Sequence, residues 1–305
     1  MRSKKDLVDT IFKKYKISKT KIIDMAGMVH SSYYRKPSLG KKGNKPSRFT
    51  YHSKNGLVTQ AVVIESVKTI LSHPFIDCGY RLMTAYLTRD GYTINHKKLY
   101  RIMKEANLLK LEDRIDRSGS GRKFVKFRKV MTVKPFDCLE MDIKMVWIPS
   151  AGKNAYLLSV IDVHTRRILI DLFAFSIKQA QVIRLLSELF MHYQYPNNVV
   201  IRSDNGSQFI AKNVREYLAM IGVAQEFTHI ATPEENAHIE AYHGILKKEI
   251  FQRFEYRTFG EIEKILKDYV LFYNNERLHG LLGRITPMEK WNADKHLILM
   301  KKITA

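Results

Sequence analysis

Three carboxylates and a lysine have residue types and a spacing that suit chemistry on phosphate esters. Asp204 lies in the segment Arg-Ser-Asp-Asn-Gly-Ser-Gln-Phe, and 35 residues separate it from Glu240. A third carboxylate, Asp142, lies upstream in Leu-Glu-Met-Asp-Ile-Lys-Met. Mg²⁺ binds oxygen ligands, and two such ions roughly 3.5–4 Å apart can activate an attacking oxygen and stabilise a leaving one. The three acids therefore predict a two-metal site, and DNA is the expected substrate.

Two neighbouring residues suit the same chemistry. Lys247 follows Glu240 by seven positions, which is two turns along one helical face. It can contact a DNA phosphate while Glu240 binds a metal ion. Asn205, directly after Asp204, could hold the loop or the DNA by hydrogen bonds.

The first carboxylate has a competitor. On a strand with period two, Glu140, Asp142 and Lys144 share one face, so Glu140 is an alternative to Asp142. Asp162 also lies nearby, and we expect it to be structural, at a hairpin turn.

Other candidate sites are weaker. The spacing of His238 and His243 around Glu240 departs from the zinc motif His-Glu-x-x-His, so both histidines are expected to pack or to contact DNA. Tyr273 and Trp291 are expected to be core residues and not catalytic ones. A recombinase with a tyrosine nucleophile is disfavoured, because no Arg-rich constellation accompanies a particular Tyr.

The elements that must position these acids follow from hydrophobic periodicity. We predict strand, antiparallel hairpin, helix, short strand, helix, short strand and helix over residues 139–145, 154–163, 166–175, 177–192, 199–201, 211–221, 223–228 and 235–250. This order resembles the ribonuclease-H-like fold. Asp142 would lie on the first, central strand, Asp204 at the end of the fourth strand beside it, and Glu240 on the following helix. Sites in open α/β sheets gather at the carboxyl ends of strands, as required here.

Positive charge is concentrated before this region. The chain has 305 residues and a net charge of +22, and residues 1–130 hold 30 Lys and Arg against 10 Asp and Glu. Residues 131–305 hold 22 against 20. A solvated basic face is the alternative, but this asymmetry favours nucleic acid as the partner of the first part.

Two small helical units are predicted within the basic part. Helices at 4–15, 19–25 and 30–35, with Gly27 in a turn, outline a helix-turn-helix. A second unit ends in a helix over 95–106, whose Lys97, Arg101 and Lys104 share one face and suit a DNA groove.

Composition excludes several classes. Cys78 and Cys138 are 60 positions apart and form no metal cluster or disulfide framework, so a reducing compartment is expected. No apolar run approaches the roughly 18 residues of a membrane span, and the first residues lack the apolar stretch of a signal peptide. We therefore expect a soluble cytoplasmic protein with no membrane partner.

The motifs together resemble the integrase-core transposases of bacterial insertion sequences. The likeness rests on the Asp-(35)-Glu spacing with its basic residue, on Ser-Asp-Asn-Gly-Ser-Gln-Phe, on Asn-Ala-His-Ile-Glu, and on Tyr-Asn-Asn-Glu-Arg-Leu-His before Ile-Thr-Pro-Met-Glu. It extends to an upstream DNA-binding segment that includes Gly79-Tyr80-Arg81, and the chain looks like the product of the second of two overlapping frames. The resemblance also favours Asp142 over Glu140, because the family places its first aspartate between hydrophobic residues.

The resemblance implies a Mg²⁺-dependent polynucleotidyl transferase, with Mn²⁺ as a substitute. Asp142, Asp204 and Glu240 would be both catalytic residues and metal ligands, and Arg81 would contact DNA. Water would expose a 3′-OH at an element end, and that hydroxyl would attack a second phosphodiester. The implied partners are double-stranded DNA, as element ends and target, a homo-oligomer of at least two copies, and a first-frame protein. Nucleoid association would follow.

The expected fold class is α/β, a ribonuclease-H-like mixed five-stranded sheet with flanking helices, preceded by small all-α helix-turn-helix domains. Two other functions remain open: a catalytically silent DNA-binding repressor, and a nuclease of the same fold. The expected domains are a helix-turn-helix at 1–35, a basic linker at 36–54, a second helical DNA-binding domain at 55–111, a basic linker at 112–130, the catalytic core at 131–292 and a tail at 293–305.

Overall fold

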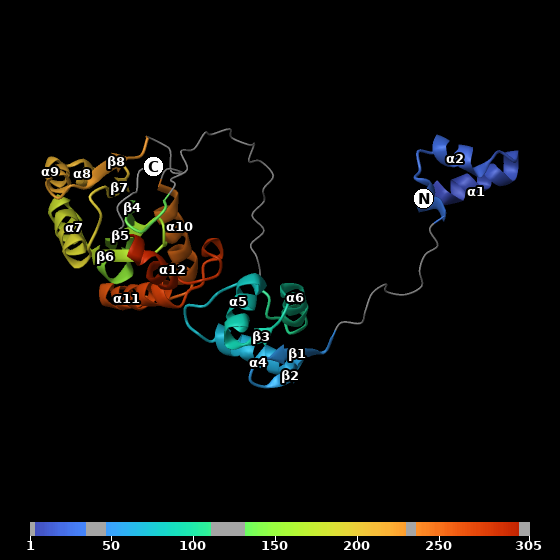
Figure 1. Cartoon of the computed structure of the whole chain (residues 1–305), viewed down its shortest axis with the longest axis horizontal. Helices are drawn as coiled ribbons and strands as arrows, with labels where there is room; N and C mark the ends of the chain where they lie inside the picture. Colours follow the sequence, from blue (N-terminus) through green and yellow to red (C-terminus); the bar gives the residue numbers. More distant parts are fainter. Residues whose placement is uncertain (1–3, 35–46, 111–131, 230–235, 299–305) are drawn as a thin grey trace. The chain divides into compact units, whose positions relative to one another are not determined.

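The computed structural model describes residues 4–34, 47–110, 132–229 and 236–298, which fall into two compact units, Met1–Ser47 and Arg48–Ala305 (Figure 1). Several sequence predictions lie outside the described residues. They are Arg35 in the third helix, most of the two basic linkers, the start of the helix expected from residue 235, and the last part of the tail.

The first unit contains three short helices, as the sequence predicts. They are α1 (Lys4–Tyr15), α2 (Lys19–Met25) and α3 (His30–Tyr34). Val8, Ile22 and Ile23 form their small core, and Ile11 and Phe12 pack against it because they follow Val8 at helical spacing on the same face of α1. Gly27 has φ +57° in the turn after α2, a conformation that glycine adopts without the steric cost other residues incur.

The first part of the second unit contains a small three-stranded sheet, whose strands the sequence prediction missed. The strand order is β2-β1-β3, and the sheet packs with three helices. The prediction of an all-helical region assigned β1 to a linker and part of β2 to a helix. Strands of two to four residues are too short to show a period of two. The elements are β1 (Phe49–His52), β2 (Gly56–Thr59), α4 (Gln60–Leu71), α5 (Tyr80–Asp90), β3 (Tyr92–Thr93) and α6 (His96–Glu105).

A mixed five-stranded sheet forms the rest of the second unit, in the order β6-β5-β4-β7-β8. Strand β4 is central, antiparallel to β5 and parallel to β7, while β5 pairs with β6 as an antiparallel hairpin. These are the strand order and directions expected of the ribonuclease-H-like fold. The strands are β4 (Cys138–Ile148), β5 (Lys153–Asp162), β6 (Ile168–Ala174), β7 (Val200–Ser203) and β8 (Ala224–Phe227).

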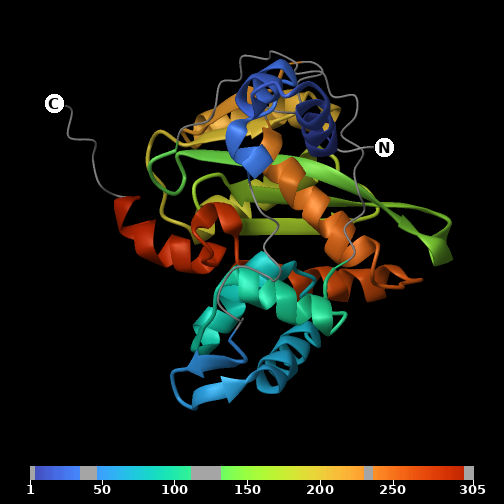
Figure 2. The same cartoon turned by 90° about the vertical axis from the view of Figure 1, so that its right-hand side faces the viewer.

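Helices cover both faces of this sheet, as Figures 1 and 2 show. Helices α7 and α9 pack with Leu139 and Met141 of β4 on one face. Helices α10 and α11 pack with Val146 and Ile148 on the other, and α10 crosses the central strands. The helices are α7 (Gln179–His192), α8 (Ser207–Ile210), α9 (Lys212–Met220), α10 (Ala237–Leu246), α11 (Phe259–Asn275) and α12 (Pro287–Asp294), with a π-helical turn η3 (Lys247–Phe251) after α10.

Helix capping and side-chain burial stabilise the last helices of this unit. Thr258 and Glu261 form a capping box at the start of α11, with both reciprocal hydrogen bonds present. Tyr273 and Trp291 are buried core residues. In the part of the chain that the structure describes, no helix is both long and apolar enough to cross a bilayer.

Candidate active site

A cleft between β4 and α10 brings together residues that are far apart in the sequence. Asp142 lies on the face of β4 that α10 covers, and its side chain is 24% exposed. Glu240 and Lys247 are exposed on the same cleft, from the first turn of α10 and from the residue that follows it. The lining residues are Asp142, Ile143, Lys144, Met145, Glu240, His243, Gly244 and Lys247. Two of the three predicted acids and the predicted lysine therefore share one opening.

Glu240 and Lys247 lie on one face of the helix, as their separation of seven residues predicts. Helix α10 stays α-helical to Leu246, so residues seven apart remain on one face. The π-turn η3 begins at Lys247 and places Glu249 inside, where its carboxylate accepts hydrogen bonds from Arg277 and from the Tyr269 hydroxyl. The chain thus changes from α-helix to π-helix at Lys247, and this change turns Glu249 toward the interior.

Glu140, the competing carboxylate, binds the start of helix α10. Its side chain is fully buried beneath the amino end of α10. One oxygen accepts from the backbone N–H groups of His238 and Ile239, both at 2.9 Å, and the other accepts from His238 Nδ1 at 2.7 Å. A carboxylate is stabilised there because the first N–H groups of a helix lack helical partners and carry partial positive charge. Glu140 therefore fixes α10 and does not line the cleft.

Asp162 is likewise structural, as expected. It is fully buried and accepts hydrogen bonds from the backbone N–H of Phe136 and from both the N–H and the hydroxyl of Thr165. Burial raises the pKa of its carboxyl, and these hydrogen bonds oppose that shift.

Asp204 follows the carboxyl end of β7 directly, where the sequence places it. Strands β4 and β7 are paired in parallel, with Glu140 opposite Arg202 as the last pair. Continuing this register by two residues puts Asp204 next to Asp142. Asp204 is exposed and accepts the N–H of Gly206 at 2.9 Å. It does not line the cleft that contains Asp142 and Glu240.

Asn205 holds the loop. Its side-chain amide donates to the backbone carbonyl of Thr228 at 2.8 Å, which ties the Asp204 turn to the end of β8. A Cβ at Gly206 would lie 3.0 Å from the Asp204 carboxylate, so a side chain there would crowd it. The hydrogen bonds of Asn205 and Gly206 therefore hold Asp204 at the end of β7.

The described part of the chain holds no preformed site with three metal ligands. Within the described ranges, which omit 230–235 just before α10, no three His, Cys, Asp or Glu side chains are grouped closely enough to hold a metal ion.

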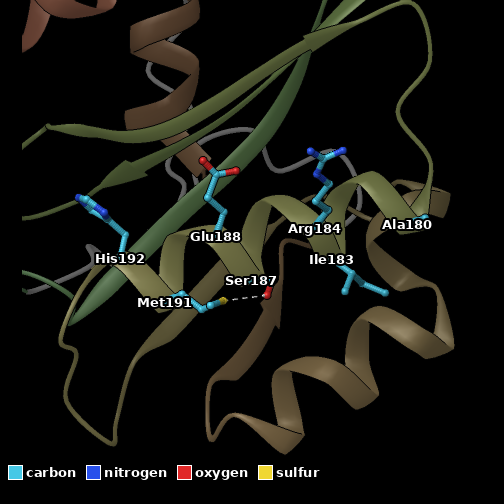
Figure 3. Close-up of a pocket in the computed structure, with 7 residues that line it drawn as sticks. All are labelled: Ala180, Ile183, Arg184, Ser187, Glu188, Met191 and His192. Atoms are coloured by element: carbon cyan, nitrogen blue, oxygen red, sulfur yellow. Dashed lines mark hydrogen bonds between the residues drawn. The ribbon is translucent and has the colours of Figure 1, made fainter.

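A second depression, on the outer face of α7, has fewer groups that could bind a metal ion. Figure 3 shows Arg184, Glu188 and His192 on one side of that helix and Ile183 and Met191 on the other. It contains one carboxylate, Glu188, so it is a poorer candidate.

The basic face predicted on α6 is exposed to solvent. Lys97 and Lys104 are exposed, and Arg101 is half-buried with its Nε 3.9 Å from Glu105. Leu99, Ile102 and Met103 bury the opposite face.

Sequence reasoning missed how α5 extends this basic face. Arg81 is exposed and lies over the ring of Tyr80, 5.9 Å from its centroid. Tyr80 in turn contacts Tyr100 of α6 edge to face, with ring centroids 5.0 Å apart. Tyr100 lies between Lys97 and Lys104 on the helical face and is 41% exposed. The signal available in the sequence was the position of Tyr100, three residues after Lys97.

Comparison with known families agrees with this architecture. Residues 132–233 and 240–291 match integrase core domain families, and residues 67–111 match an HTH-like domain family. The two core matches contain the three predicted acids. By these matches, the chain contains integrase-core segments with an HTH-like segment before them.

Several relatives in sequence come from insertion elements. A 39.2 kDa protein of insertion element IS476 from Xanthomonas euvesicatoria is 26% identical over 76% of this chain, and the match spans 64% of that protein's length. InsK of the IS150 element of Escherichia coli is 27% identical over 70% of this chain and 77% of its own. The transposase of IS904 from Lactococcus lactis is 22% identical over 77% of this chain and 96% of its own.

Two solved structures are also similar. A simian T-cell lymphotropic virus intasome chain has a TM-score of 0.46 and 10% identity over 81% of this chain and 77% of its own. The catalytic core domain of BIV integrase has a TM-score of 0.41 and 17% identity over 53% of this chain and 97% of its own. The fold assignment rests on the strand order and the family matches.

Proposed function

We propose that this chain is a DNA transposase that cleaves at element ends and joins the exposed 3′-OH to target DNA. The proposal rests chiefly on one observation, that Asp142 and Glu240, from separate elements of an integrase core, line one cleft with Lys247. The HTH-like domain and the basic face of α6 supply the surface for DNA. Transposases among the relatives support the same conclusion.

The donor set suits Mg²⁺ or Mn²⁺. Asp142, Asp204 and Glu240 offer carboxylate oxygens, the ligands that hard divalent cations prefer, and two of them already share the cleft. Asp204 follows a parallel strand beside Asp142 and would complete the set. When bound, such ions would supply charge stabilisation for an in-line phosphoryl displacement.

The side chains of this chain have distinct tasks in the proposed reaction. Lys247 and Lys144 would bind phosphate oxygens at the two sides of the cleft and orient the scissile bond. Asn205 would keep Asp204 at the end of β7, and Glu140 would keep Glu240 over β4 by fixing the start of α10. No described residue needs to form a covalent bond to DNA, because water and then the 3′-OH are the nucleophiles.

The test uses full-length protein, with a first-frame partner protein added if needed, and DNA bearing element ends. The parent should nick and join this DNA in Mg²⁺ or Mn²⁺ but not in EDTA. Glu240→Gln should lower both activities at least about 100-fold, because a metal ligand is lost while shape is kept. DNA affinity should stay within about twofold, since Glu240 contributes no attraction to phosphate. The control Glu216→Gln removes the same charge from α9 and should have parental activity.

Other outcomes separate the alternatives. DNA binding without cutting would indicate a silent repressor, and cutting without joining would indicate a nuclease. A Glu240→Gln variant as active as the parent would show that this cleft is not the catalytic site. We further propose that the chain acts as at least a dimer, since two element ends must be paired.

A further inference from the structure

His243 lies behind Asp142 at the base of the cleft. It is on α10, one turn after Glu240, and its side chain is 7% exposed. Its Nδ1 lies 3.2 Å from Asp142 Oδ2. The other carboxylate oxygen of Asp142 accepts the backbone N–H of Ile143 at 2.8 Å. Each oxygen of Asp142 therefore lies beside one nitrogen of the protein, and one of these nitrogens is on the helix that carries Glu240.

The contact sets the direction of the His243 ring. A carboxylate oxygen accepts, so the tautomer with its proton on Nδ1 is the one that can donate to Asp142. Nε2 is buried and has no hydrogen-bond partner among the described residues. Holding a ring this way leaves one nitrogen without a bond in the interior, which costs stability. A histidine that served only to fill space would be replaced at lower cost by an apolar side chain.

The surroundings of this contact are also polar. Ser159 lies directly opposite Asp142 in the β4–β5 register, and Asp171 lies opposite Ser159 in the β5–β6 register. Residues directly opposite in adjacent strands share a face of the sheet, so all three lie on the side that α10 covers. Ser159 Oγ is fully buried and has no hydrogen-bond partner in the described structure. The floor beneath His243 is therefore a polar row within an otherwise apolar layer.

We propose that His243 is a positioning residue, whose Nδ1–H holds the Asp142 carboxylate in the orientation that binds metal. Metal-binding carboxylates are generally hydrogen-bonded by a neighbouring group, and loss of that group typically weakens metal binding about 10–100-fold. His243 also links Asp142 to the turn of α10 that follows Glu240, so the two carboxylates are held by one helix. This inference rests on the proposed function, because it assigns Asp142 as a ligand.

The experiment measures Mn²⁺ binding to the full-length protein by calorimetry and by electron paramagnetic resonance. His243→Phe keeps the ring volume and removes the donor, and should raise the Mn²⁺ dissociation constant about 10–100-fold. His243→Asn keeps an N–H donor near the Nδ1 position and should stay within a few-fold of the parent. Tyr242→Phe is the matched control. It changes the neighbouring buried residue by one hydroxyl that has no described partner, and should not alter Mn²⁺ affinity.

The outcomes are separable. Parental Mn²⁺ affinity in folded His243→Phe would overturn the proposal, as would equal weakening in His243→Phe and His243→Asn. Melting temperature is recorded for each variant, because a packing role would lower it without discriminating Asn from Phe in Mn²⁺ affinity. Asp142→Asn is measured in parallel. If it leaves Mn²⁺ binding unchanged, the proposed metal site itself is wrong. If it alone weakens binding, only the role of His243 is wrong.

Discussion

The two acids that the sequence leaves in competition, Glu140 and Asp142, should separate completely under substitution. Glu140 is buried and binds two backbone N–H groups at the start of α10, whereas Asp142 is partly exposed in the cleft. We expect Glu140→Gln to lower stability and Asp142→Asn to lower activity. Glu140→Gln should therefore change the free energy of unfolding, and Asp142→Asn should change the rate of the reaction.

The magnitude for Glu140→Gln follows from its contacts. Hydrogen bonds to charged groups contribute about 1.5–3 kcal/mol each, against about 1 kcal/mol for neutral ones. Glutamine keeps one acceptor oxygen for the two N–H groups but loses the charge, and with it an attraction to the helix amino end of up to about 2 kcal/mol. The free energy of unfolding should fall by about 2–4 kcal/mol. Asp142 is partly exposed, and its contacts are His243 at 3.2 Å and the adjacent Ile143 N–H at 2.8 Å, both of which asparagine can still make in part. For Asp142→Asn the free energy of unfolding should therefore change by under about 1 kcal/mol.

Chemical denaturation of the full chain measures both variants, and strand transfer is assayed well below each melting temperature. Asp142→Asn should lose at least about 100-fold in rate with parental stability. Glu140→Gln should remain active once folded. The reasoning is refuted if Glu140→Gln abolishes activity at unchanged stability, because Glu140 would then be the metal-binding acid.

Two further results are expected. Burial raises the pKa of Asp171 to about 6, so the folded state holds this proton more tightly than the unfolded chain does. The free energy of unfolding should therefore fall by about 3 kcal/mol as pH rises from well below 4 to well above 6. Urea denaturation at pH 4 and pH 8 should record about 2 kcal/mol of this fall in the parent and none of it in Asp171→Asn. An equal fall in the two proteins would contradict the burial argument. Replacing Lys97 and Lys104 together by Ala should reduce the slope of log affinity against log salt by about 2, since each lysine is expected to neutralise one phosphate. Fluorescence anisotropy with duplex DNA measures this, and an unaltered slope would place the DNA elsewhere.

Much of this protein was determined by sequence patterns of short range. The strand around Asp142 and the helix around Glu240 each have an apolar period that only one type of element satisfies, so their types were predictable. The basic face of α6 followed from three positions at helical spacing. Strands β1, β2 and β3 were missed because two to four residues carry too little periodicity to detect.

The choice between neighbouring acids needed the tertiary structure. Glu140 and Asp142 share one face of β4, and sequence periodicity gives them equal standing. What separates them is the place where α10 crosses the strand, since the helix begins over Glu140 and leaves Asp142 open to the cleft. The same crossing brings His243 against Asp142, a contact between residues about one hundred positions apart. Sequence alone therefore determined which residues are candidates for the proposed chemistry, and packing of the helix on the sheet decided which of them face one another.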